Sequence, residues 1–170
     1  MSDNMQDTNG VLVQGHIKIF DPESQKVYID KRNAIHYENM SIALAESLSN
    51  AGAGFIYEMS FGNGGTSVDP TGIITYLTPN STGTNASLYN QTYTKVVDDR
   101  SVNNTDPARN KLETRHVSGT NYTDIVVRLR SYSPDGSGKL ITHVIFHPVQ
   151  KSLNRLIQID YTVRVQSLAG

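Results

Sequence analysis

The chain has 170 residues and a mass of 18.7 kDa, which suits one compact domain and is too short for two large ones. It contains no cysteine, and this excludes disulfides, thiolate zinc sites, iron–sulfur clusters and cysteine nucleophiles. Fifteen Lys and Arg against sixteen Asp and Glu give a formal net charge of -1, so no global cationic field draws the protein to nucleic acid or to an anionic membrane.

Polarity in this chain comes mainly from neutral side chains. Ser, Thr and Asn supply 45 of the 170 residues, whereas charged residues make up 18%, below the roughly 25% of an average domain. This composition is typical of β-rich folds with polar loops, and it lowers the electrostatic cost of bringing identical copies into contact.

The polarity of the sequence predicts one domain preceded by a flexible N-terminal arm. Residues 1–10 are polar and acidic and lack the basic start and apolar run of a secretory signal, so we expect a flexible N-terminal arm there. We expect residues 11–170 to form a single β-rich domain. No window approaches the roughly 18 consecutive apolar residues of a membrane span, so we expect a soluble protein, made in the cytoplasm, without a membrane partner.

The first predicted element is a β-hairpin. Apolar and polar residues alternate along residues 11–19, and this period of two predicts a strand in which Gly15 forms a bulge. Residues 21–25 carry turn chemistry around a proline, and an extended pattern resumes at residues 27–29.

One long helix is predicted over residues 35–50, with Gly52 as its stop signal. Apolar residues recur within it at three- and four-residue spacing, at Tyr37, Met40, Leu44 and Leu48. We expect this stripe to be buried against the flank of the sheet, while a polar side that includes Asn39 faces solvent.

Short strands separated by turns are predicted in the middle of the chain. They fall at residues 55–61, 73–77 and 93–97, between clusters of Gly, Pro and Asn. Residues 98–115 contain few apolar side chains and are long for an idle connection, so we expect that stretch to be either mobile or used for contacts.

The last third shows the clearest strands. Residues 125–129 alternate, a turn rich in Pro and Gly follows at 134–138, and the uniformly apolar residues 140–146 predict a central strand. Residues 157–165 alternate strictly, which is typical of an antiparallel strand with one wet face. The predicted fold class is therefore mainly β: an antiparallel β-sandwich or small barrel with one long α-helix.

Candidate catalytic and metal-binding patterns are weak. His143 and His147 are four residues apart, but in a strand this spacing spans about 13 Å, too far for both to bind one zinc ion. The glycine-rich residues 62–67 lack the lysine of a phosphate-binding loop. Asp98 and Asp99 are adjacent, and adjacent residues of a strand point to opposite faces. We expect no enzyme activity, catalytic residue, metal or cofactor.

Three blocks of sequence resemble a known class of proteins. They read NAIHYENMS at residues 33–41, IYEMSFGNGGT at residues 56–66 and LYNQTY at residues 88–93, the last followed by VVDD at residues 96–99. These blocks resemble small virion structural proteins of bacteriophages with contractile tails. The placement that the resemblance favours is the neck, as a collar subunit that rings the joint between head and tail.

The resemblance implies a virion protein without catalytic residues. A ring subunit repeats one heterologous contact until the ring closes, so it implies a cyclic homo-oligomer that also touches other proteins of the neck, tail or capsid. It implies no direct reading of nucleic acid. We expect the arm from Met1 to Gly10 to lie along a neighbour's strand edge, and residues 79–91 and 98–115 to dock laterally.

Four further contact residues are expected because Tyr and Arg carry much of the energy of protein interfaces. They are Tyr89, Tyr93, Arg100 and Arg109. The alternative is that Tyr93 belongs to the core and that both arginines are simply solvated.

Other functions stay open on the sequence. A head-decoration or baseplate subunit would also be β-rich and non-enzymatic. A carbohydrate-binding β-sandwich would need exposed aromatic platforms or a calcium site, and the lack of Trp weighs mildly against it. A hydrolase is the least favoured, because neither a nucleophile elbow nor a metal motif is present.

Overall fold

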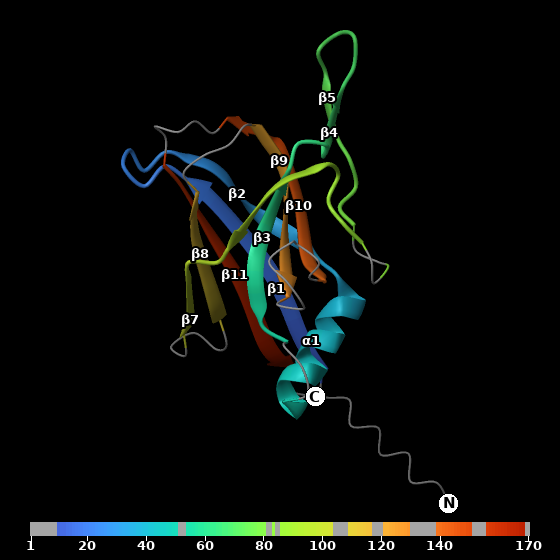
Figure 1. Ribbon diagram of the computed structural model, residues 1–170, viewed down its shortest axis with the longest axis vertical. Helices are drawn as coiled ribbons and strands as arrows, with labels where there is room; N and C mark the ends of the chain where they lie inside the picture. The colour runs from blue at the N-terminus through green and yellow to red at the C-terminus, as the bar shows by residue number, and fades with distance from the viewer. Residues whose placement is uncertain are drawn as a thin grey trace, which may run out of the picture.

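The computed structural model describes residues 10–50, 54–80, 83, 86–103, 109–116, 121–129, 139–150 and 156–168 (Figure 1). Within these ranges the helix is α1 (Tyr37–Ser49). The strands are β1 (Gly10–Phe20), β2 (Val27–Ile35), β3 (Ile56–Gly62), β4 (Thr66–Val68), β5 (Ile74–Tyr76), β6 (Gln91–Val96), β7 (Asp99–Asn103), β8 (Arg109–His116), β9 (Asn121–Leu129), β10 (Leu140–Gln150) and β11 (Ile157–Leu168).

Nine strands form one antiparallel sheet in the order β6-β3-β9-β10-β2-β1-β11-β8-β7, and β4 pairs with β5 in a separate hairpin. Strand β2 joins the two halves of the large sheet, because its residues up to Asn33 pair with β1 whereas Ala34 and Ile35 pair with β10. The end strands β6 and β7 each pair with one neighbour in the described chain, so the sheet does not close into a barrel. The predicted mainly β, antiparallel fold with one helix is confirmed.

The hydrophobic core lies between the two halves of the sheet. Strand β11 shows why: Ile159, Tyr161 and Val163 are buried, while the residues between them are half-exposed. Buried side chains from β1, β3 and β10 complete the same cluster, including Ile17, Ile19, Met59, Phe61, Val144 and Phe146. Each such side chain contributes about 1.5–3 kcal/mol by leaving water, so this packing fixes which face of every strand points inward.

The expected bulge at Gly15 is wrong. Pairing of β1 with β11 runs without interruption through Gly15, pairing of β1 with β2 starts in register at Gly15 and Asn33, and the register shift lies between Ile19 and Phe20. A Cβ atom at Gly15 would lie 2.0 Å from Asn33 Oδ1, so glycine serves here to let three strands pack closely.

Helix α1 begins and ends at residues with clear capping roles. The N-cap is His36, whose Nδ1 accepts a hydrogen bond from Asn39 N at 3.2 Å. The helix ends at Asn50, whose φ of 52° places it in the left-handed region. The stop therefore comes before the predicted Gly52, which lies outside the described residues.

The expected burial of the apolar stripe on α1 is confirmed for Met40 and wrong for the rest of the stripe. Leu48 is 89% exposed and Tyr37 is 74% exposed, whereas Asn39, assigned to the wet side, is fully buried. The helix crosses the end of the sheet and contacts it through Met40 and Ala43, which pack on residues of β1, β2 and β10. This narrow contact leaves most of the periodic stripe at the surface.

The stretch predicted as a mobile or contact segment, residues 98–115, contains two strands. Strand β7 pairs with β8, and β8 pairs along its whole length with β11 from His116–Ile157 to Arg109–Arg164. The sequence of β8 has only a weak apolar pattern, but its backbone hydrogen bonds to the strongly alternating strand β11 keep it extended. The predicted strands at the C-terminal end are confirmed as β9, β10 and β11, and β10 is central; the turn at 134–138 lies outside the described residues.

Candidate functional site

The predicted contact residue Tyr89 is tied into the fold. Its hydroxyl donates to the Thr78 carbonyl, and its ring lies 5.5 Å from the His143 ring, centroid to centroid. Its own carbonyl accepts from Gly64 N at 3.1 Å. Tyr89 therefore holds the loop before β6 against β10 and against the turn after β3.

Tyr93 and Arg100 lie at opposite edges of the large sheet. Tyr93, on β6, is half-buried and packs on the core with its ring 5.9 Å from that of Phe61. Arg100, on β7, is exposed, and its guanidinium carbon lies 5.2 Å from the centre of the Phe55 ring.

The other contact predictions concern chain ends and pairing. Gly10 is the first residue of β1 and pairs with Leu168 of β11, while Met1 lies outside the described residues. Arg109 begins β8, opposite Arg164 of β11. Among the described side chains, those of Tyr89 and Tyr93 pack within the fold and that of Arg100 is exposed on β7.

Two histidines, His36 and His143, are held inside the fold by hydrogen bonds. His36 is fully buried between Asn39 N at Nδ1 and the Gly83 carbonyl at Nε2, 2.8 Å away. His143, also fully buried on β10, accepts at Nδ1 from Asn80 N at 2.9 Å. Among the described residues no three His, Asp or Glu side chains gather into a group that could hold a metal ion.

The hairpin β4–β5 projects beyond the body of the molecule (Figure 1). Val68 and Ile73 are each 63% exposed on it, although apolar side chains this close together favour burial. Its base is anchored by Leu77 N, which donates to the Gly65 carbonyl at 3.0 Å. Sequence reasoning placed turns on both sides of β5 but missed β4, because three residues carry too short a pattern to read.

The tip of this hairpin is built by Asp69. Its Oδ1 accepts from Thr71 N at 2.9 Å, from Thr71 Oγ1 at 2.6 Å and from Ile73 N at 2.9 Å. The hydrogen bonds from the Thr71 hydroxyl and from Ile73 N hold the pKa of Asp69 below its usual value. Gly72 supplies the left-handed φ of 86° that closes the turn. The exposed apolar residues are therefore presented on a preformed support.

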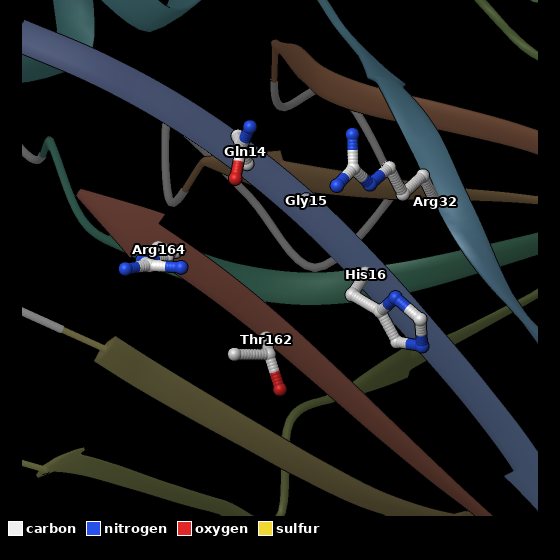
Figure 2. A pocket seen from close by; sticks show the side chains of 6 residues that line it. All are labelled: Gln14, Gly15, His16, Arg32, Thr162 and Arg164. Carbon is white, nitrogen blue, oxygen red and sulfur yellow. The ribbon is translucent and has the colours of Figure 1, made fainter. Parts of the chain in front are cut away.

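A pocket of about 330 Å³ lies on the outer face of the sheet, over β2, β1 and β11 (Figure 2). It is lined by Gln14, Gly15, His16, Arg32, Thr162 and Arg164. Figure 2 shows Arg32 on one side of β1 and Arg164 on the other, with Gln14 and His16 on β1 between them. Sequence reasoning named neither arginine as a site residue.

Comparisons with protein-family models, with curated proteins and with solved structures give no match for this chain. Within the described residues, no helix is long and apolar enough to cross a membrane. Function must therefore be argued from the surface features just described.

Proposed function

We propose that the protein is a non-enzymatic structural subunit of a contractile-tailed phage particle, which assembles into a ring at the neck through repeated contacts between copies. The resemblance of residues 33–41, 56–66 and 88–93 supports the particle and the neck placement. The observation that carries the assembly is a pair of different exposed apolar patches at the two ends of the molecule.

The first patch is the tip of the β4–β5 hairpin, and the second is the outward stripe of α1. Val68 and Ile73 form the hairpin patch, and Tyr37, Leu44 and Leu48 form the helix patch. Figure 1 shows the hairpin at one end of the long axis and α1 at the other. A heterologous ring needs two unlike, complementary surfaces on each copy, and these patches supply two unlike apolar surfaces.

Residues of the three blocks that carry the resemblance hold the helix and the hairpin in place through hydrogen bonds. Asn39 Nδ2 donates to the Leu140 carbonyl at 2.8 Å and so fixes α1 to β10. Asn63 N and Gly64 N donate to the carbonyls of Asn90 and Tyr89, and so fix the turn that leads into the hairpin. The residues that carry the resemblance thus hold both proposed contact elements in place.

Sedimentation velocity of the purified full chain tests the assembly. We expect a discrete oligomer whose mass falls toward the monomer in V68S/I73S and in L48S, with unchanged thermal unfolding, because these side chains are at the surface. V27S is the matched control, since Val27 is exposed on β2 away from both patches. A monomer at every concentration of the unmodified chain would overturn the assembly.

Mixing the two variants tests the head-to-tail geometry. V68S/I73S keeps an intact helix patch and L48S keeps an intact hairpin, so an equimolar mixture should form one contact and give heterodimers. A mixture that stays monomeric would contradict the pairing of the two patches.

The position in the particle needs a separate measurement. Density for this chain in reconstructed particles should appear only where the head joins the tail. Density distributed over the head would instead assign a decoration subunit, and density at the far end of the tail a baseplate subunit.

A further inference from the structure

We propose that the pocket over β2, β1 and β11 binds an oxyanion, a carboxylate or a phosphate, between the guanidinium groups of Arg32 and Arg164. The inference is independent of ring formation, because every residue of the pocket comes from one chain (Figure 2).

The sheet register places the lining side chains on one face. Arg164 is paired with Gln14, and both Thr162 and Arg32 are paired with His16. Residues paired across antiparallel strands point to the same side of the sheet. The five side chains therefore form two adjacent rows, with a guanidinium at either flank of β1.

The two arginines have no acidic partner in the described chain. The acidic residue closest in register, Asp30, is bonded to His16. In the next row Asp160 accepts from Gln158 Nε2 at 2.9 Å and is paired with Lys18. Asp30 and Asp160 are thus engaged beside the pocket, and the described lining contains no carboxylate.

Arg164 has a buried hydrogen-bond donor, Nε, that lacks an acceptor among the described residues. A buried donor without a partner costs about 1–3 kcal/mol, and a guanidinium binds carboxylate or phosphate with two parallel hydrogen bonds. An oxyanion in the pocket would satisfy this donor and would offset the repulsion between the two guanidinium groups.

The remaining lining fits the same class of ligand. Gln14 and Thr162 offer neutral donors at the rim, and the volume of about 330 Å³ falls in the range of small-ligand sites. The two guanidinium groups and the neutral donors therefore lie together on one part of a chain whose net charge is -1.

Isothermal titration of the full chain with inorganic phosphate, at constant ionic strength, tests the proposal. We expect saturable binding of one phosphate per chain. In R32Q and in R164Q the binding should weaken about tenfold or more, the loss of one charged hydrogen-bonding group. K18Q is the control, because it removes one positive charge from the next row of the same face. The affinity of K18Q for phosphate should stay within about twofold of that of the unmodified chain.

A second titration with glutarate identifies the source of the anion. Tighter binding of phosphate would indicate a phosphorylated ligand, and tighter binding of glutarate an acidic protein side chain; either result supports an oxyanion site. Absence of saturable binding of both anions up to about 10 mM, or an equal loss in K18Q, would overturn it, because general surface charge would then explain the data. Circular dichroism of R32Q, an exposed position, confirms that the variant is folded.

Discussion

Gly15 on β1 and Tyr161 on β11 lie so close that a Cβ atom at Gly15 would stand 2.9 Å from the Tyr161 hydroxyl oxygen. The same atom would stand 2.0 Å from Asn33 Oδ1 on β2. The residue without a side chain thus lies where three strands meet, directly beneath the pocket that Arg32 and Arg164 flank. Gly15 thus belongs both to the close contact between the strands and to the lining of the pocket.

Substitution of Gly15 by alanine should destabilise the protein by about 1–3 kcal/mol, the usual cost of overpacking a core. Urea unfolding of G15A would measure this loss. The Asn33 side chain is the closest obstacle, so alanine at residue 15 should cost less in the N33A background than in the unmodified chain. Equal costs in both backgrounds would show that Asn33 moves aside freely.

Stability should fall with pH above about 10 because of Tyr161. Burial raises the pKa of its hydroxyl from 10.0 to about 12, and the neighbouring Thr142 and Asn33 side chains oppose part of that shift. Between these values the unfolded chain releases a proton that the folded chain keeps, so each pH unit costs up to about 1.4 kcal/mol. Urea unfolding at pH 9, 10 and 11 measures the slope.

Y161F is the control for that slope, because it removes the ionising group and keeps the ring. Lys31 acts in the opposite direction, since burial lowers the pKa of its amine and the unfolded chain then binds the proton more tightly below 10.5. In Y161F the stability near pH 10 should therefore fall less steeply or rise. A slope unchanged by Y161F would contradict the assignment.

Asn39 should contribute more to stability than any exposed polar residue of α1. It is fully buried, and its Nδ2 donates to the Leu140 carbonyl at 2.8 Å. N39A leaves that carbonyl without its partner, and we expect a loss of about 1–3 kcal/mol in urea unfolding. S41A is the matched control, because Ser41 is exposed and bonds only within its own turn; its change should stay below about 0.5 kcal/mol.

Strands with a full period of two were predictable, whereas their pairing with strands far away in sequence was not. The alternation of residues 157–165 predicted β11 with its wet face, which carries Arg164. The wet face of β1 was equally visible around His16. The local β1–β2 hairpin joins Arg32 to the face of His16. Arg164 is added only by the register of β1 with β11, strands far apart in sequence, and no local pattern encodes that register.

Helix α1 shows a second limit of sequence reasoning. Its periodicity predicted the helix but not the side that meets the sheet, because the contact is made where β10 begins and β2 ends. Asn39 is polar and reads as solvent-facing, yet a carbonyl 101 residues away in sequence gives it a buried partner. For the same reason Tyr89 reads as a free contact residue, although its hydroxyl is held by the Thr78 carbonyl.

The hairpin patch should depend on Asp69 for its order and not for the stability of the whole domain. D69A removes the acceptor of Thr71 N and Ile73 N, so amide hydrogen exchange at these two residues should accelerate while exchange in β10 stays unchanged. If the tip is a required contact, D69A should also weaken self-association without altering the midpoint of thermal unfolding.

The charge on Asp69 gives this effect a defined pH dependence. Its pKa is lowered in the folded chain from the usual 3.8, so the carboxylate supports the tip above about pH 4 and that support disappears as the pH falls through the lowered value. Exchange at Ile73 in the unmodified chain, corrected for the intrinsic rate, should then approach that of D69A under acid conditions. T71V removes only the hydroxyl donor and should raise the pKa of Asp69, which moves the transition toward higher pH; a transition that stays in place would show that the backbone amides alone hold the carboxylate.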